Sequence, residues 1–335
     1  MSPDNKFKPI SLKNTSVVVV WRRVDDLKKT KSFVKQVFPW SKIGEDLMAV
    51  MYDAGNLMVG YGIRLDPSLE KEVIGDAKAV VPKDAAARGG KLPLRVLADD
   101  ACSGLALSRY DLVSNPASRF QVMTANFDNS VKQFNTSFKM TAAPVTTTDA
   151  RSLTFLDDSG NFYSFVKPTV SAWQGKAKEK LGVMMKTSNE LAKKDPKSSA
   201  VLSIDLVVSN LANSNEFYSK TLGLSVLSKT KDSIRFDLGT IILTLRQETS
   251  IGLVKRLAQT GRFSNDWIVF HAKDIRATTE GLAMKGVKFP AGIEESGIGD
   301  VAYFFDPDGH AFAIWQPSGK PTHINFYPVL NRLVR

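Results

Sequence analysis

The chain has 335 residues, a formal net charge of +11 and one cysteine, Cys102. Its length favours two domains over one, and a lone cysteine excludes both an internal disulfide and a zinc site made of several thiolates. No apolar run reaches the ~18 residues that a membrane helix needs, and residues 1–13 lack the apolar core of a signal peptide. We therefore expect a cytoplasmic protein with no membrane partner.

The excess positive charge is spread along the chain, with one dense group of lysines between residues 176 and 197. No aromatic side chains alternate with these lysines, as they do where a protein stacks on bases. The pattern favours solvated helix faces, and we expect no specific nucleic-acid partner.

Taken in chain order, the sequence repeats one pattern four times: an apolar strand, an Asp or Asn, an amphipathic helix, and then strands that include a turn. The Asp or Asn stands where a helix N-cap accepts a backbone N–H. These N-caps are predicted at Asp26, Asn126, Asn210 and Asp274. The last two helices are predicted to stop at Gly223 and Gly286, because glycine readily ends a helix.

The strand pairs are clearest at residues 301–317, where Asp306, Pro307, Asp308 and Gly309 follow one another as in a tight turn. Further strands are predicted within residues 51–61, 155–168, 233–237 and 240–246. His310 follows the turn glycine, and we expect it to be exposed to solvent. The predicted fold class is α+β, with four βαβββ units.

We expect these units to fall into two domains. The predicted parts are an N-terminal domain at residues 16–170 with an insertion at 64–118, a basic helical connector at 171–199, a C-terminal domain at 200–318, and a tail at 319–335 that is apolar enough to pack on the rest.

The pattern resembles that of the vicinal oxygen chelate superfamily, which includes glyoxalase I, extradiol dioxygenases and bleomycin-resistance proteins. The resemblance is carried by IDLVVSNLANSNEFYSKTLGL at residues 204–224 and by YFFDPDG at 303–309. It implies that two βαβββ units roll into an incomplete barrel, a cup that holds a ligand, so that four units make two cups. We expect one cup in each domain. Units of this family also pair across chains, which leaves a homodimer open.

Metal enzymes of this family take ligands, usually His or Glu, from the first and last strands of each unit. These positions fall on Ser203 and Thr244 in the third unit, on Trp267 and Ala313 in the fourth, and near Val19, Val59, Arg119 and Ser164 in the first half. None of these side chains is a good ligand for a divalent metal. We therefore expect no metal and no other cofactor.

Side chains alternate along a strand, so residues two positions away face the same cup. This adds Asp205, Arg246, His271 and Trp315 to the C-terminal cup, and Tyr303 of the last hairpin joins the predicted ligand-binding set of Ser203, Thr244, Arg246, Trp267, Ala313 and Trp315. In the N-terminal cup, Arg23 and Arg119 are candidates for binding an anion.

Three hypotheses remain open. The first is that Trp267 and Trp315 sandwich a small, planar, anionic organic ligand held by Arg246, with no metal. The second is an isomerase, lyase or dioxygenase type of enzyme, in which Asp205 and His271 act as an acid–base pair or bind a shifted metal together with Glu248. The third is a non-catalytic scaffold subunit, in which Asp205, His271 and Arg246 form a structural network.

Overall fold

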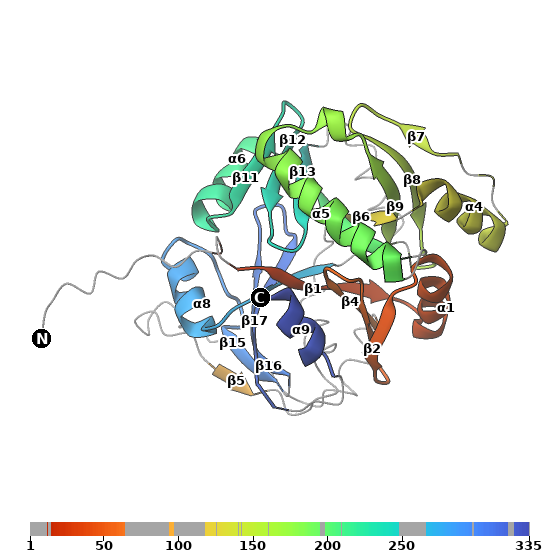
Figure 1. The fold of residues 1–335 in the computed structure, drawn as a ribbon. Helices are drawn as coiled ribbons and strands as arrows, with labels where there is room; N and C mark the ends of the chain where they lie inside the picture. The colour runs from red at the N-terminus through yellow and green to blue at the C-terminus, as the bar shows by residue number, and fades with distance from the viewer. Residues whose placement is uncertain are drawn as a thin grey trace, which may run out of the picture.

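The computed structural model describes residues 12, 15–63, 94–96, 118–124, 126–139, 141, 143–159, 161–194, 198–208, 210–247, 266–296, 298–320 and 325–334. Two β-sheets dominate this part of the chain (Figure 1). Sheet A has nine strands in the order β2-β3-β4-β1-β14-β17-β16-β15-β5, and sheet B has eight in the order β11-β12-β13-β10-β6-β9-β8-β7. Both sheets are open, and the α+β class with four βαβββ units is confirmed.

The strands of sheet A are β1 (Val17–Val24), β2 (Ser41–Glu45), β3 (Ala49–Asp53), β4 (Met58–Ile63), β5 (Leu94–Val96), β14 (Trp267–His271), β15 (Ile293–Ser296), β16 (Gly299–Phe305) and β17 (Ala311–Pro317). The strands of sheet B are β6 (Ser118–Thr124), β7 (Val145–Thr146), β8 (Ala150–Leu156), β9 (Phe162–Pro168), β10 (Ser199–Val208), β11 (Ser225–Lys229), β12 (Ser233–Asp237) and β13 (Ile242–Gln247).

The α-helices are α1 (Leu27–Val37), α4 (Phe127–Phe138), α5 (Gly175–Lys194), α6 (Leu211–Glu216), α8 (Ile275–Ala283) and α9 (Tyr327–Leu333). A π-helical turn at Phe217–Thr221 extends α6, and a 3₁₀ turn at Val170–Ala172 precedes α5. No helix in the described ranges is long and apolar enough to span a membrane.

The units pair in a different order from the one expected. β1 lies antiparallel to β14, so the first unit shares sheet A with the fourth. β10 lies antiparallel to β6, so the second and third units share sheet B. The expectation that units three and four form one cup is therefore wrong, and residues 16–170 and 200–318 do not delimit the sheets.

A buried ion pair accompanies this pairing. Nε and Nη2 of Arg22 on β1 donate to the Asp266 carboxylate at 3.0 and 2.9 Å, directly before β14. The same guanidinium lies over the rings of Phe120 and Tyr163 in sheet B, 4.1 and 4.4 Å from their centroids. The four opening strands are similarly apolar, so the selective contact comes from this one polar group, which the repeat pattern does not reveal.

All four predicted N-caps are confirmed. Asp26 accepts from the backbone N–H groups of Lys28 and Lys29, and Asn210 accepts from those of Ala212 and Asn213. Asn126 and Asp274 each cap the third residue of their helices, at 3.1 and 2.9 Å. Gly223 and Gly286 have positive φ angles of 76° and 90°, as helix-ending glycines require.

The basic connector is helical, as predicted, but it is a packed part of sheet B. α5 contacts β6, β10 and β11 and crosses in front of this sheet in Figure 1. Ala177, Leu181 and Met184 on its inner side are buried, and Lys180 Nζ lies 2.7 Å from the Asp237 carboxylate.

The turn of the last hairpin encloses a buried polar cluster. Asp306 accepts hydrogen bonds from the backbone N–H groups of Asp308 and His310, from the Tyr218 hydroxyl and from the His310 ring. His310 is 3% exposed, so the expectation that it faces solvent is wrong. The Asp306 carboxylate draws the ring inward because it is itself buried and needs donors.

One large apolar core lies between the two sheets and their helices, and alternation leaves each sheet a second face. On β10, Ile204 and Leu206 enter this core, whereas Ser203 and Asp205 point to the other face. That other face is polar and hollow in sheet B. In sheet A it carries a second apolar cluster.

Candidate functional site

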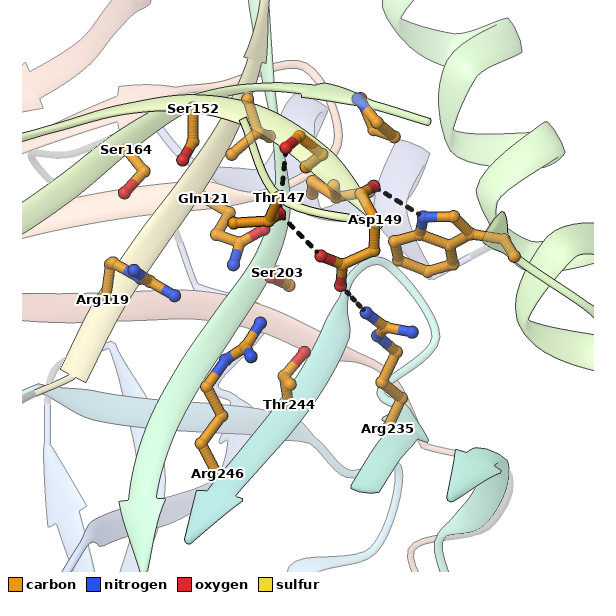
Figure 2. A pocket seen from close by; sticks show the side chains of 15 residues that line it. Arg119, Gln121, Thr147, Asp149, Ser152, Ser164, Ser203, Arg235, Thr244 and Arg246 are labelled. Atoms are coloured by element: carbon orange, nitrogen blue, oxygen red, sulfur yellow. Dashed lines mark hydrogen bonds and ion pairs between the residues drawn. The ribbon is translucent and has the colours of Figure 1, made fainter. Parts of the chain in front are cut away.

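The polar face of sheet B holds a pocket of about 320 Å³ (Figure 2). Its lining combines three arginines with a carboxylate, an amide and several hydroxyls. The lining residues are Arg119, Gln121, Thr147, Asp149, Ala150, Ser152, Ser164, Val166, Pro168, Trp173, Leu202, Ser203, Arg235, Thr244 and Arg246.

Adjacent strands place the pocket residues opposite one another. In the register of sheet B, Gln121 on β6 stands beside Ser203 on β10 and Ser164 on β9. Thr244 on β13 stands beside Arg235 on β12. Both halves of the pocket therefore come from the central strands of the paired second and third units, and neither unit could form it alone.

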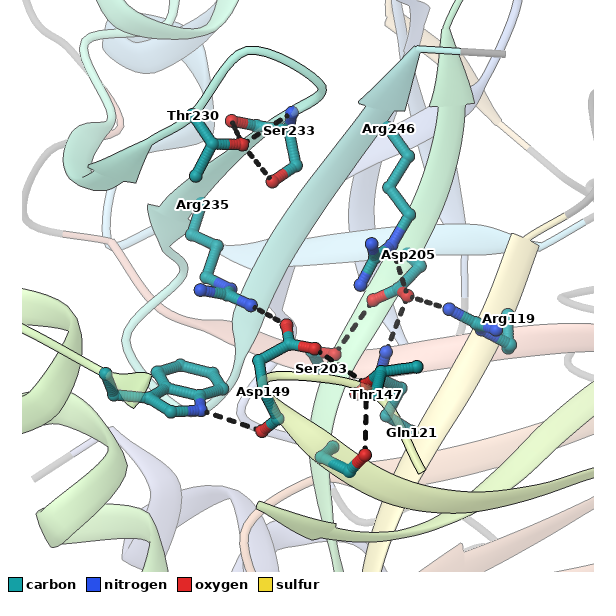
Figure 3. Close-up of polar contacts among 12 residues, drawn as sticks. Arg119, Gln121, Thr147, Asp149, Ser203, Asp205, Thr230, Ser233, Arg235 and Arg246 are labelled. Atoms are coloured by element: carbon teal, nitrogen blue, oxygen red, sulfur yellow. Dashed lines mark hydrogen bonds and ion pairs between the residues drawn. The ribbon is translucent and has the colours of Figure 1, made fainter. Parts of the chain in front are cut away.

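Asp205 organises the cationic side of the pocket (Figure 3). Its Oδ2 accepts from Arg119 Nη2 at 2.6 Å, from Gln121 Nε2 at 2.6 Å and from Arg246 Nε at 3.2 Å. Its Oδ1 accepts from the Ser203 hydroxyl at 3.0 Å. The carboxylate is thus fully engaged and holds two guanidinium groups at one place.

The environment keeps Asp205 ionised. Burial raises the pKa of a carboxyl group, but the charges of Arg119 and Arg246 and the hydrogen bonds to this carboxylate outweigh burial, so the Asp205 pKa is lowered. A carboxylate in this state is a poor proton acceptor at neutral pH.

A second ion pair forms the opposite wall. Arg235 Nη2 lies 2.6 Å from the Asp149 carboxylate, and the Arg235 guanidinium stacks on the Trp173 ring at 4.0 Å. Trp173 Nε1 in turn donates to the Asp149 backbone oxygen at 3.3 Å, and Thr147 donates to its carboxylate. Arg235 is therefore neutralised and held in place.

Arg119 and Arg246 differ from Arg235 in charge balance and exposure. They share the single negative charge of Asp205, and their side chains remain 33% and 40% exposed, whereas Asp205 is 4% exposed. In Figure 2 the two guanidinium groups point toward one another across the pocket. One positive charge is left over at this point, with N–H groups available to a ligand.

The predicted site residues fall into two groups. Ser203, Thr244 and Arg246 line the sheet B pocket, and Asp205 binds residues of its wall. His271, Trp267, Tyr303, Ala313 and Trp315 belong to sheet A, on β14, β16 and β17. The predicted pairing of Asp205 with His271 is therefore wrong, because β10 and β14 lie in different sheets. Glu248, named for a shifted metal site with these two, lies outside the described residues.

The two predicted tryptophans do not face one another across a ligand. Trp267 packs edge-on against Tyr303 at 4.8 Å, and Trp315 packs against Phe326 at 5.0 Å. Both indoles are buried in the apolar cluster of sheet A. His271 is half-buried at the end of β14, and burial together with the charge of Lys273 lowers its pKa.

The strand positions from which related metal enzymes draw ligands do not suit a divalent ion here. In sheet B, Gln121, Ser164, Ser203 and Thr244 offer amide and hydroxyl oxygens, and in sheet A, Trp267 and Ala313 offer none. In the part of the chain that the structure describes, no three His, Cys, Asp or Glu side chains are grouped closely enough to hold a metal.

Several pocket residues were not predicted from the sequence. Arg119 and Gln121 were assigned to a separate N-terminal cup, with Arg23 as the anion-binding partner of Arg119, whereas Arg23 is buried in sheet A and donates to the Ile63 oxygen. Arg235 could have been found from its register with Thr244. Asp149 and Trp173 lie outside the alternating strand pattern and carry no such signal.

Comparison with known proteins supports the same fold. Residues 200–314 match the sequence model of the Glyoxalase/Bleomycin resistance protein/Dioxygenase superfamily. Glyoxalase I from Zea mays superposes with a TM-score of 0.55 at 14% identity, over 95% of this chain and 96% of that one. A Bacillus subtilis protein provisionally assigned as a dioxygenase superposes with a TM-score of 0.56 at 11% identity, over 96% of each chain. No curated protein matches the sequence.

Proposed function

Residues 200–314 form a member of the Glyoxalase/Bleomycin resistance protein/Dioxygenase superfamily, and we propose that the sheet B pocket, which this segment shares with the second unit, binds a small organic anion. The observation that carries the proposal is the uneven charge at Asp205: one carboxylate faces two guanidinium groups. An anion placed between Arg119 and Arg246 restores the balance and uses their exposed N–H groups.

The rest of the lining indicates what else the anion carries. Ser164, Ser203 and Thr244 place hydroxyls on the floor, and the Gln121 amide lies beside them. Such groups hydrogen-bond to hydroxyl or carbonyl oxygens of a ligand. Trp173, the aromatic residue among the lining side chains, is 5% exposed and stacks on Arg235. This chemistry favours an oxygen-rich anion, such as a hydroxy acid or a sugar phosphate, over a flat aromatic one.

Binding is favoured over acid–base catalysis at this site. The lining residues include no histidine or cysteine, and the arginines hold Asp205 in its ionised form. The groups present can orient a ligand and compensate its charge, but no described side chain in the pocket is suited to exchange a proton near neutral pH.

A thermal-shift screen tests this proposal. The panel contains gluconate, glycerol phosphate, citrate and benzoate, and each is added to the wild-type chain, to Arg246→Ala and to Arg276→Ala. Arg276 is exposed on α8 over sheet A and serves as the matched control. We expect an oxygen-rich anion to raise the melting temperature of the wild type and of Arg276→Ala, because a ligand that binds the folded state stabilises it.

The same anion should give little or no shift with Arg246→Ala. The proposal is wrong if no anion stabilises the wild type, or if Arg246→Ala responds as the wild type does. A protein of this kind that ignores every anion while binding one protein partner would instead fit a scaffold role.

A further inference from the structure

The second hollow face of the molecule, that of sheet A, is filled by the chain's own C-terminal helix α9. Phe326 and Leu330 are 2% and 3% exposed and belong to the apolar cluster on this face. The Phe326 ring lies 5.0 Å from that of Trp315 on β17. The last unit supplies the lining, and the segment after it supplies the cover.

The lining beneath α9 is apolar and rich in aromatic rings. Trp21, Trp267, Trp315 and Tyr303 form most of it, and none of the described members of the cluster is charged. Ala311 and Ala313 place short side chains between the larger ones on β17, beside Trp267 and Val269 in the register. Sheet A thus offers a surface that suits an uncharged aromatic molecule, the opposite of the cationic pocket in sheet B.

Few contacts hold α9 in place. It has seven residues, far below the ~12–15 at which an isolated helix becomes marginally stable in water, and its N-cap makes no side-chain hydrogen bond. Besides the two apolar anchors, one ion pair joins Arg332 to Asp53 at 2.6 Å, with Arg332 48% exposed. An exposed pair of this kind contributes little, so α9 is helical because it is docked.

We propose that α9 is a displaceable plug: it occupies the aromatic hollow of sheet A, and a neutral aromatic molecule binds there once α9 has left. The inference is independent of the anion site, since it concerns the other sheet and a ligand without charge. Binding of such a molecule and docking of α9 are mutually exclusive, so the affinity seen with the full chain is reduced by the fraction of molecules in which α9 is docked.

The test uses the neutral fluorescent probe N-phenyl-1-naphthylamine with three proteins. These are the wild type, a chain that ends at Asn325, and full-length Phe326→Ser/Leu330→Ser, with Asn331→Ser on the exposed side of α9 as the control. We expect the shortened chain and the double variant to bind the probe at least about tenfold more tightly than the wild type and Asn331→Ser do. A synthetic peptide of residues 325–335 should displace it from the shortened chain.

Introducing Ala313→Trp into the shortened chain should remove probe binding, because the larger ring fills the hollow. If the shortened chain keeps its circular dichroism but binds the probe no better than the wild type, or if the peptide fails to displace the probe, the inference is wrong. Hydrogen exchange on the wild type keeps the test open should the shortened chain misfold. Amides of residues 327–333 must then exchange much faster than those of β14, and equal protection would overturn the proposal.

Discussion

Arg119 and Asp205 lie 86 residues apart in the sequence, yet Nη2 of the first donates to Oδ2 of the second at 2.6 Å. The contact joins β6 of the second unit to β10 of the third at the wall of the sheet B pocket. Arg246 and Gln121 meet the same carboxylate oxygen. One buried carboxylate thus links the pairing of the two units to the charge of the site they form.

Replacing Asp205 should lower both stability and anion binding. Asp205→Ala leaves two arginines without their shared acceptor, and we expect it to lower the free energy of unfolding by about 1–3 kcal/mol, since both arginines can still reach water. Asp232→Ala, an exposed carboxylate in the turn before β12, should change it by less than ~0.5 kcal/mol. Urea denaturation measures both, and equal effects would show that the Asp205 contacts contribute nothing.

The Asp205 contribution should also depend on pH in one direction. Because its pKa is lowered in the folded state, the stabilisation is present above the unfolded value, about 3.9, and is lost as the pH falls through the folded value. The difference in stability between wild type and Asp205→Ala should therefore shrink below about pH 4. A difference that grows on acidification would contradict this account.

Trp173 should matter through its ring more than through its N–H. Trp173→Phe keeps an aromatic face beneath Arg235 and loses one hydrogen bond, at a cost of about 1 kcal/mol. Trp173→Ala removes a buried ring and the stacking partner of Arg235, at a cost of about 3–5 kcal/mol. Equal costs, measured by denaturant titration, would mean that the stacked geometry is not what holds this wall.

The Tyr218 hydroxyl should stabilise the last hairpin. It donates to buried Asp306 at 2.7 Å, so Tyr218→Phe removes one donor to a buried carboxylate and should cost about 1–3 kcal/mol. The same change at Tyr327, whose hydroxyl lies 3.5 Å from that of Ser318, should cost less than ~0.5 kcal/mol. Thermal unfolding of the two variants decides the matter, and a reversed order would show that the Asp306 cluster is not structural.

The amide, hydroxyl and alkyl groups at the strand positions discussed above predict a protein that holds no tightly bound divalent metal through them. Elemental analysis after dialysis should find zinc, nickel, iron and manganese well below one atom per chain. One equivalent of any of them, retained on dialysis and lost in Thr244→Val, would show that these positions do bind metal.

The sequence was sufficient for local structure. Helix starts at Asp26, Asn126, Asn210 and Asp274 were predictable because an N-cap is a contact between residues two or three apart. The turn at Asp306–Gly309 was predictable for the same reason, although the inward position of His310 was not. Its partner Tyr218 lies 88 residues away from Asp306.

The partner of each unit was not predictable. Every opening strand has an apolar side that fits the same kind of neighbour, so the alternation that placed Ser203, Asp205 and Thr244 on one face was correct without revealing which unit completes that face. Asp205 was therefore paired with His271, although its true partners are Arg119, Gln121 and Arg246. The anionic character expected of the ligand depends on Arg246 and finds support in sheet B. The planar character depended on Trp267 and Trp315, which lie in sheet A.

The most direct test of the anion site is a calorimetric double-mutant cycle at Arg119 and Arg246. The anion with the largest thermal shift is titrated into the wild type, Arg119→Ala, Arg246→Ala and the double variant. Each single change should weaken binding by about tenfold or more, ~1.4 kcal/mol, and the double change should cost less than the sum, because both side chains contact one ligand. Unchanged affinity in either single variant, or strictly additive losses, would contradict a shared anion between the two arginines.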